Sequence, residues 1–323
     1  MVKNILITGG AGYIGSHITE ILLRQNKNIF LVDNLSTGYK KLINKKAKFF
    51  KADIQSIKKI NQIIVKNRID SVIHLAASLI IGVGEKYPKK YYKNNVIGTQ
   101  NILNACKGTT VNNFIFSSTA AVYKDGLYRV SENSELKPKS IYGKTKLKAE
   151  KLIQNFCSKE KINYGILRYF NIAGASPTGK IGLINKSDHL FKNFSREIFK
   201  KKPLLKIYGT NYDTKDGSCI RDFIHVSDIA EIHFKILEKI AQLKTSKILN
   251  CGYSKGTTVL EVAKEFQKQS DKKVNLIKLP RRKGDLGKII ASNDKLKKFI
   301  KWSPKYNKLN IIVKSCLNWE KKQ

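Results

Sequence analysis

The chain has 323 residues, of which 41% are hydrophobic and 9% aromatic, enough for a large core and for two lobes. Its formal net charge of +38 raises the question of nucleic-acid binding. The positive charge is mostly lysine, spread through nearly every segment together with abundant Ile and Asn, and no nucleic-acid recognition motif accompanies it. We therefore expect a solvated lysine coat and no nucleic-acid partner.

The cysteines and the apolar runs indicate the compartment. The five cysteines are odd in number, far apart and never in a C-x-x-C pattern, which argues against a disulfide framework or a zinc site. The run ILIT follows Met1 almost at once, which does not fit a signal peptide, and no run approaches the roughly 20 apolar residues of a membrane span. We expect a cytoplasmic protein with no membrane partner and no metal.

The first half of the chain alternates short apolar runs with longer amphipathic stretches. Strands are predicted at 4–8, 29–33, 48–53, 71–76, 113–118 and 164–169. Helices are predicted between them, at 14–25, 57–67 and 95–106. Strands that are apolar without strict alternation and are separated by helices predict a parallel sheet covered on both faces.

After Asn171 the rhythm loosens into loops rich in Gly, Pro and Lys. Shorter elements are expected around 188–201, 226–241, 257–269 and 307–321. The segment KILNCGY (247–253) again has the composition of a sheet strand. The second lobe is therefore expected to be interleaved with the first.

The stretch ILITGGAGYIG places three glycines, Gly9, Gly12 and Gly15, between the first predicted strand and the first predicted helix. Glycine allows a tight turn and a close approach of a pyrophosphate, and the helix N-terminus supplies free N–H groups and a favourable dipole. Asp33 ends the second strand, where a carboxylate accepts ribose hydroxyls and repels a 2′-phosphate, which favours NAD over NADP. Asp53 closes the third strand and is expected near the adenine edge.

The stretch IYGKTK places Tyr142 four residues before Lys146, with Gly143 between them. Residues four apart share one face of a helix, so both heads can reach one ligand. A Tyr/Lys pair alone is also typical of any lysine-rich surface helix. Its meaning therefore depends on the rest of the chain.

The motifs GGAGYIG, YYKNN, SSTAAVY, YGKTK, RYFNIAGA, DGSCIRDFIHVSDIA and PRRKGDL follow one another across almost the whole chain. Together they resemble the UDP-glucose 4-epimerase family of extended short-chain dehydrogenases/reductases. The resemblance implies an α/β fold with a Rossmann-type doubly wound parallel sheet of about seven strands in an NAD-binding domain, residues 1–173. It implies a smaller, partly interleaved UDP-sugar-binding domain, residues 174–323, with 247–253 returning to the first sheet. It also implies a homodimer and one tightly held NAD for each chain.

The same resemblance gives Tyr142 a chemical task, the removal of the proton from the hexose 4-hydroxyl while the hydride of C4 passes to NAD. An isolated phenol has a pKa near 10 and is a poor base at pH 7. Two positive charges, the Lys146 ammonium and the oxidised nicotinamide ring, are expected to favour the phenolate and lower that pKa. Thr119 is expected to hold the same hydroxyl by a hydrogen bond. Tyr142, Lys146 and Thr119 are the predicted catalytic residues.

The resemblance also implies which residues contact the cofactor and the substrate. Cofactor contacts are expected from Gly9, Gly12, Tyr13, Ile14, Gly15, Asp33, Asn34, Asp53, Ile54, Leu75, Ala76, Asn94, Ser117, Tyr142, Lys146, Tyr169 and Phe170. Substrate contacts are expected from Thr119, Asn171, His189, Leu190, Arg221, Arg282 and Asp285. The guanidinium forks of Arg221 and Arg282 suit a diphosphate.

Three other functions stay open. The substrate could be another UDP-sugar, such as UDP-N-acetylglucosamine or UDP-glucuronate. A sugar-nucleotide 4,6-dehydratase needs an acid–base pair directly after the catalytic Thr, where this chain has Ala120 and Ala121, whose methyl groups carry no proton. A non-enzymatic protein that binds NAD or nucleic acid is expected to lose the Tyr or the Lys, and this chain retains both.

Overall fold

The structure is a computed structural model of the chain, and it describes residues 2–184, 189–281 and 287–323. Its largest unit is a seven-stranded sheet in the order β12-β7-β5-β4-β1-β2-β3, with every neighbouring pair parallel. The strands are β1 (Asn4–Thr8), β2 (Asn28–Asp33), β3 (Lys48–Lys51), β4 (Ser71–His74), β5 (Asn113–Thr119), β7 (Asn163–Tyr169) and β12 (Lys247–Cys251). β12 lies at one edge of this sheet, beside β7.

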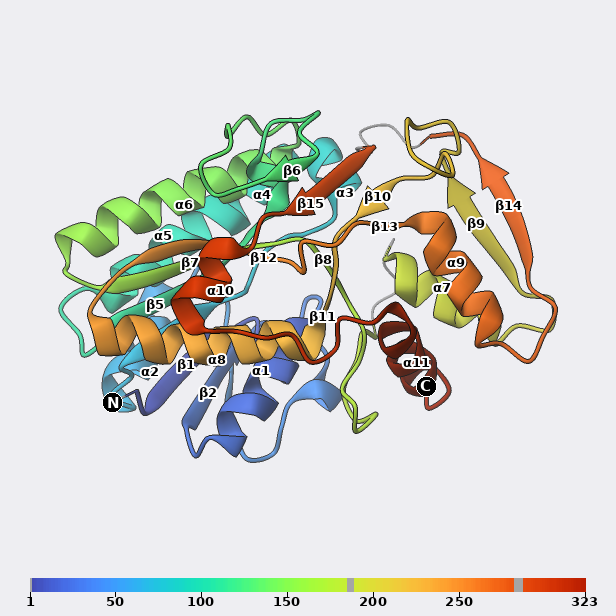
Figure 1. The fold of residues 1–323 in the computed structure, drawn as a ribbon. Helices are drawn as coiled ribbons and strands as arrows, with labels where there is room; N and C mark the ends of the chain where they lie inside the picture. The colour runs from blue at the N-terminus through green and yellow to red at the C-terminus, as the bar shows by residue number, and fades with distance from the viewer. Residues whose placement is uncertain (1, 185–188, 282–286) are drawn as a thin grey trace.

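Two sets of helices cover the two faces of the sheet (Figure 1). On one face, α1 (Tyr13–Arg24) packs beside α8 (Val226–Leu243). On the other lie α2 (Ile57–Lys66), α5 (Gly98–Cys106) and α6 (Ile141–Lys159). The α/β class and the parallel, doubly covered sheet expected from the sequence are confirmed.

The uniform apolar character of the strands follows from this double cover. In β1, Ile5 and Ile7 belong to the core under α1 and α8, whereas Leu6 belongs to the core under α2, α5 and α6. All three side chains are fully buried, so neither face of the strand tolerates a polar residue. The carboxyl ends of the strands then all emerge at one edge of the sheet, where an open α/β sheet binds its ligands.

The second lobe is built from small sheets and short helices (Figure 1). Its strands are β6 (Arg129–Val130), β8 (Asn171–Ala173), β9 (Leu204–Tyr208), β10 (Ile220–Arg221), β11 (Phe223–His225), β13 (Thr257–Thr258), β14 (Asn275–Leu279) and β15 (Lys288–Ala291). Its helices are α7 (Leu190–Ile198), α9 (Val259–Lys268) and α11 (Leu309–Glu320). Another late helix, α10 (Asp294–Ile300), packs on the first lobe beside β12 and α8. The order β13-β10-β15-β6 makes one four-stranded sheet, while β8 pairs with β11 and β9 with β14.

The segment between β4 and β5 is less regular than the sequence predicts. It contains the short helices α3 (Ile81–Lys86) and α4 (Pro88–Tyr92), then one π-helical turn, η2 (Lys93–Ile97), that runs directly into α5. The predicted helix over 95–106 therefore begins as a π-helical turn, a feature often found at functional sites. No helix within the described ranges is long and apolar enough to cross a membrane.

Candidate active site

The three glycines at the junction of β1 and α1, here called the glycine cradle (Gly9, Gly12 and Gly15), are required by their surroundings. Gly9 has a φ of +73°, and a Cβ there would lie 2.8 Å from the backbone nitrogen of Ala76. A Cβ on Gly15 would lie 2.5 Å from the carbonyl oxygen of Gly9. Gly12 is the N-cap of α1 without a side-chain cap, and the first turn holds no acidic residue. The first turn of α1 therefore has neither a capping side chain nor an acidic residue of its own at its N–H groups, which suits an anion.

Asp33 ends β2 directly beside the cradle. Its carboxylate is buried and accepts N–H groups from Ala11 (3.1 Å) and Leu35 (2.8 Å). Burial raises the pKa of Asp33, and these two hydrogen bonds partly oppose the rise. A Cβ on Gly38 would lie 2.8 Å from Asp33 Oδ1, so only glycine leaves this carboxylate open on that side. The sequence patterns did not indicate Gly38, although it ends the turn STG that follows the strand.

Other expected cofactor contacts lie just after the ends of β2, β3 and β4. Asn34 Nδ2 donates to Asp53 Oδ2 at 2.8 Å, and both side chains are exposed. Ile54 is buried beneath them. After β4, the N–H of Leu75 donates to the Thr8 carbonyl at 3.1 Å. These residues and the cradle line one continuous edge of the sheet.

Several of the other residues expected to contact the cofactor make hydrogen bonds or packing contacts within the protein. The Tyr13 hydroxyl donates to the Gly174 carbonyl at 2.6 Å, which ties α1 to the second lobe. Ile14 packs against the core. Asn94, on η2, donates to Ser78 Oγ at 3.1 Å. Ala76 abuts Gly9 so closely that its backbone leaves no room for a side chain there.

Thr119, Tyr142 and Lys146, here called the reaction centre, are brought together by β5 and α6. Thr119 is the last residue of β5, and Tyr142 lies in the first turn of α6; the Thr119 hydroxyl accepts the N–H of Ala121 at 3.2 Å and is near enough to act on the pKa of Tyr142. A Cβ on Gly143 would clash with the Ala121 carbonyl oxygen, so glycine lets this helix pack directly on the segment after Thr119.

The start of α6 is fixed by two further side chains. Ser140 Oγ accepts the N–H of Gly143 at 3.0 Å, and Glu85 Oε1 accepts the N–H of Ile141 at 2.8 Å. Ser140 is the N-cap of the helix, a position at which serine is favoured. Glu85 contacts the start of the helix from α3, and because it lies 56 residues earlier in the sequence no local pattern indicates this contact. The helix carrying Tyr142 is thus anchored at its first turn.

The charges of the reaction centre differ from the sequence-based expectation. Burial raises the pKa of Tyr142 to about 12, and the hydrogen bond from Thr119 opposes this only in part. Burial lowers the pKa of Lys146 to about 7, with Glu150 acting in the opposite direction. The Lys146 ammonium lies 4.2 Å from the centre of the Phe116 ring. Within the protein alone, desolvation therefore outweighs the expected lowering of the Tyr142 pKa, because the helix and β5 exclude water from both groups.

The residues expected beside the nicotinamide are buried at the ends of β5 and β7. Thr119 and Tyr169 are paired in the register of these strands. The Tyr169 hydroxyl is hydrogen-bonded to His233 Nε2 at 2.6 Å, so its ring is fixed in place. Phe170 follows directly and is buried, as is Ser117. The role of His233 is therefore structural.

The expected substrate residues lie on several elements of the second lobe. Asn171 is exposed at the start of β8, and Arg221 is half-buried in β10, where one of its N–H groups donates to the Ile220 carbonyl at 2.9 Å. His189 donates from Nε2 to the Ile172 carbonyl at 2.6 Å, while its buried Nδ1 makes no hydrogen bond to the described residues. Leu190 begins α7 and packs on the core of this lobe. Two further predicted residues lie outside the described residues, namely Arg282 and Asp285.

The described part of the chain contains no group of three or more His, Cys, Asp or Glu side chains that could hold a metal ion. The five cysteines are buried and unpaired in disulfides. Burial raises the pKa of the Cys157 thiol to about 12, which makes it a poor nucleophile.

Comparison with known proteins places this arrangement in a family. Residues 5–252 match the NAD dependent epimerase/dehydratase family. A UDP-glucose 4-epimerase of Azospirillum brasilense is 35% identical, with 98% of this chain and 92% of that protein covered. The crystal structure of the Stenotrophomonas maltophila UDP-glucose 4-epimerase with bound NAD and formylated UDP-arabinopyranose superposes with a TM-score of 0.95 at 29% identity, covering 99% of this chain and 98% of that one.

A third relative is the UDP-Glc/GlcNAc 4-epimerase of Campylobacter jejuni, whose structure is 37% identical with a TM-score of 0.86 and covers 99% of this chain and 100% of that one. The matches extend over both lobes, and the family match over residues 5–252 spans the cradle and the reaction centre. This chain therefore belongs to the NAD dependent epimerase/dehydratase family, and its relatives there include UDP-glucose 4-epimerases.

Proposed function

We propose that this protein is an isomerase that interconverts UDP-galactose and UDP-glucose through a transient 4-keto sugar with a tightly held NAD. The observation that carries the proposal is the reaction centre: a tyrosine in the first turn of a helix, beside a threonine at a strand end and one helical turn before a buried lysine. This trio lies at the same sheet edge as the glycine cradle. A base, a hydroxyl ligand and a cation are thus placed where a dinucleotide and a sugar can meet.

The glycine cradle fits NAD. Its open helix N-terminus suits a pyrophosphate, and Asp33 suits the two hydroxyls of an adenosine ribose. A buried carboxylate at this point disfavours a 2′-phosphate, so NADP is a poorer fit. When bound, NAD supplies the acceptor and donor for the hydride of the sugar C4.

Tyr142 is the base in this proposal. Its phenolate takes the proton of the hexose 4-hydroxyl, and Thr119 holds that hydroxyl in line. With a pKa raised to about 12, the phenol is a weak source of phenolate unless positive charge lies nearby. The Lys146 ammonium is the cation that the protein itself provides, so its protonation state matters for the rate.

Net inversion at C4 requires that the keto sugar present its other face before the hydride returns. The hexose must therefore be held loosely, while the diphosphate and uridine are held firmly. Arg221 and Asn171 are the described residues that we assign to this anchor, and Arg282 and Asp285 are assigned from the sequence alone. A guanidinium offers a paired fork to phosphate oxygens, which suits this task.

UDP-N-acetylglucosamine is a second candidate substrate. The Campylobacter jejuni relative, named for both glucose and N-acetylglucosamine, is 37% identical to this chain. The choice between the two sugars depends on the room beside the sugar C2. The homodimer and the cytoplasmic location stay predictions.

The test is an assay of the purified protein with UDP-galactose and no added NAD. We expect UDP-glucose to appear, with the products separated by ion-exchange chromatography, because the cofactor stays bound through purification. UDP-N-acetylglucosamine and UDP-glucuronate, tested in parallel, decide the substrate class. Conversion of none of the three, with NAD then added and still no product, would overturn the proposal.

A further inference from the structure

Glu150 is a buried charge that the proposed mechanism leaves unused. It follows Lys146 by four residues, as Lys146 follows Tyr142, so the three side chains lie along one face of α6. Glu150 is 0% exposed and Lys146 is 2% exposed. A carboxylate in such a place is strongly disfavoured unless it is paired and hydrogen-bonded. The buried Glu150 carboxylate therefore needs hydrogen-bonding and charged partners.

Those partners come from the two strands that carry the site. Arg168 grips Glu150 with two hydrogen bonds, Nε to Oε1 at 3.0 Å and Nη2 to Oε2 at 2.7 Å. Ser118 Oγ also donates to Oε1. Ser118 and Arg168 are paired in the register of β5 and β7, directly before the pair of Thr119 and Tyr169. This Glu150 clamp (Ser118, Glu150 and Arg168) therefore joins α6 to both strands one residue below the reaction centre.

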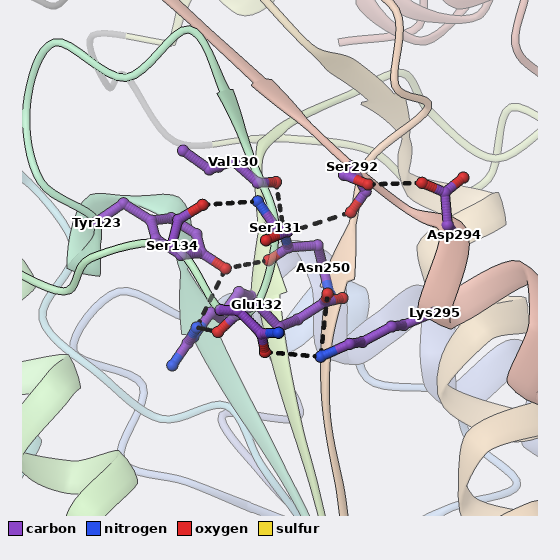
Figure 2. A network of polar contacts seen from close by, with 11 residues as sticks. Tyr123, Val130, Ser131, Glu132, Ser134, Asn250, Ser292, Asp294 and Lys295 are labelled. Carbon is purple, nitrogen blue, oxygen red and sulfur yellow. Dashed lines mark hydrogen bonds and ion pairs between the residues drawn. The ribbon is translucent and has the colours of Figure 1, made fainter.

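The far side of the clamp is held as well. Arg168 Nη1 donates to the Tyr123 hydroxyl at 3.1 Å, and Tyr123 donates to Asn250 Oδ1 at 2.6 Å. Figure 2 shows Asn250 between Tyr123, Glu132 and Val130; its N–H donates to Glu132 Oε1 at 2.8 Å and its Nδ2 to the Val130 carbonyl at 2.9 Å. The network thus runs from α6 through β7 and β12 to β6 of the second lobe.

We propose that Glu150 is a positioning residue for the reaction: the clamp fixes α6 against the ends of β5 and β7, and its carboxylate keeps the Lys146 side chain charged. This inference rests on the proposed function of Tyr142. The clamp is built for such a role because Arg168 and Ser118 together hold both carboxylate oxygens in place, one helical turn from Lys146. Glu150 acts to raise the pKa of Lys146, against the lowering by burial.

The other ionisable groups that face this part of α6 do not supply that charge. His74, on β4, has its pKa lowered by burial to about 3 and is neutral near pH 7. Burial raises the pKa of Tyr91 and of Tyr169, so both phenols are neutral there as well. Glu85 acts at the first turn, on the N–H of Ile141.

The charges farther along the network are matched among themselves. Glu132 has Lys295 at 4.0 Å, and it receives the N–H of Asn250. The guanidinium of Arg168 contacts the Tyr123 hydroxyl on the side away from Glu150. Glu150 is therefore the anion that acts on Lys146, as its effect on the lysine pKa indicates.

The test compares Glu150→Gln with Arg168→Gln, two variants that break the same ion pair. In Glu150→Gln, the loss of the anion should lower the pKa of Lys146, so the alkaline limb of the kcat–pH profile moves down by about one pH unit or more. In Arg168→Gln, the carboxylate remains, so the limb should not move down. A merely structural clamp predicts the same pH profile in both variants with a lower active fraction, and that result would overturn the inference.

A second readout does not depend on turnover. An NMR pH titration of each protein with ¹³Cε-labelled lysine, in which the Lys146 signal is assigned from its loss in Lys146→Arg, gives the midpoint at which this buried amine loses its proton. We expect a lower midpoint in Glu150→Gln than in the wild-type protein and Arg168→Gln; equal midpoints would contradict the proposal even if the wild-type protein converts no UDP-sugar. If Glu150→Gln does not fold, the neutral pair Glu150→Gln/Arg168→Gln takes its place with a smaller expected lowering, because the loss of the Arg168 charge acts in the opposite direction.

Discussion

The glycine cradle and the reaction centre lie at the same edge of one sheet, but different parts of the residues form them. The cradle is formed by backbone atoms that approach closely because the residues are glycines; a Cβ added at Gly15 would lie 2.5 Å from the Gly9 carbonyl oxygen. The reaction centre consists of two half-buried hydroxyls and a buried amine, and desolvation shifts the pKa values of Tyr142 and Lys146. Substitutions in the cradle should therefore act through shape, whereas those in the reaction centre should act through charge and hydrogen bonding.

The largest effect on stability and NAD content is expected from a substitution that creates a steric clash in the cradle. In Gly15→Ala the new methyl group meets the backbone of Gly9 and Gly10, which cannot move aside as a flexible side chain could. We expect a loss of about 1–3 kcal/mol in the free energy of unfolding and a purified protein that retains little NAD. Thermal unfolding and the NAD content after acid release measure the two effects.

Gly82→Ala is the matched control for that substitution. Gly82 lies in α3, where an added Cβ meets nothing within 4 Å. Because alanine favours helix, we expect a gain of about 0.5–1 kcal/mol in stability and an unchanged NAD content. Equal damage by the two alanines would show that shape does not govern the cradle.

A smaller effect is expected from Thr119→Val, which keeps the shape of the side chain and removes its hydroxyl. The variant should retain NAD and melt near the wild-type temperature, but its kcat should fall about tenfold to a hundredfold, the range for a hydrogen bond to a charged group. Thr119→Ser, which keeps the hydroxyl, should stay within a few-fold of the wild type. Loss of NAD from the valine variant would contradict the claim that the cradle, and not the reaction centre, holds the cofactor.

The smallest effect is expected from Asp33, which is a charged side chain, as in the reaction centre, but lies beside the glycine cradle. Burial raises its folded-state pKa above the unfolded value, so the folded NAD-free protein gains stability as pH falls through this window and loses it again as pH rises. Asp33→Asn should therefore slightly stabilise the NAD-free protein at pH 7 while weakening NAD binding about tenfold, as the charge-assisted hydrogen bonds are lost. Thermal melts at pH 4 and pH 7 and an NAD titration measure these opposite changes, and a destabilised NAD-free variant at pH 7 would contradict them.

The positions of most strands could be predicted from the sequence because each buried strand has its own local run of apolar residues. β1 matches the predicted 4–8, and β2, β5 and β7 differ from their predicted ranges by one residue at an end. Buried strands and amphipathic helices leave distinct apolar patterns, and the cradle has a fixed spacing of glycines. The two-residue strands β6, β10 and β13 leave no such pattern, because their pairing depends on neighbours far along the chain.

The sequence indicates candidate residues for the site but not the energetics of those residues. The spacing of Tyr142 and Lys146 shows that they share a helix face, whereas the burial that raises one pKa and lowers the other depends on how α6 packs against β5. The Glu150–Arg168 pair joins residues 18 positions apart on a helix and a strand, with no motif to announce it. Gly38 is recognisable only once the Asp33 carboxylate is seen beside it.

The central claim is that Tyr142 moves the proton of the sugar hydroxyl and that NAD stays bound when the phenol hydroxyl is removed. The most direct measurement is the kcat of Tyr142→Phe for UDP-galactose, made together with its bound NAD content. We expect an unchanged NAD content and a kcat lowered at least about a hundredfold, the scale of general acid–base catalysis. A phenylalanine variant that turns over at nearly the wild-type rate would contradict the claim.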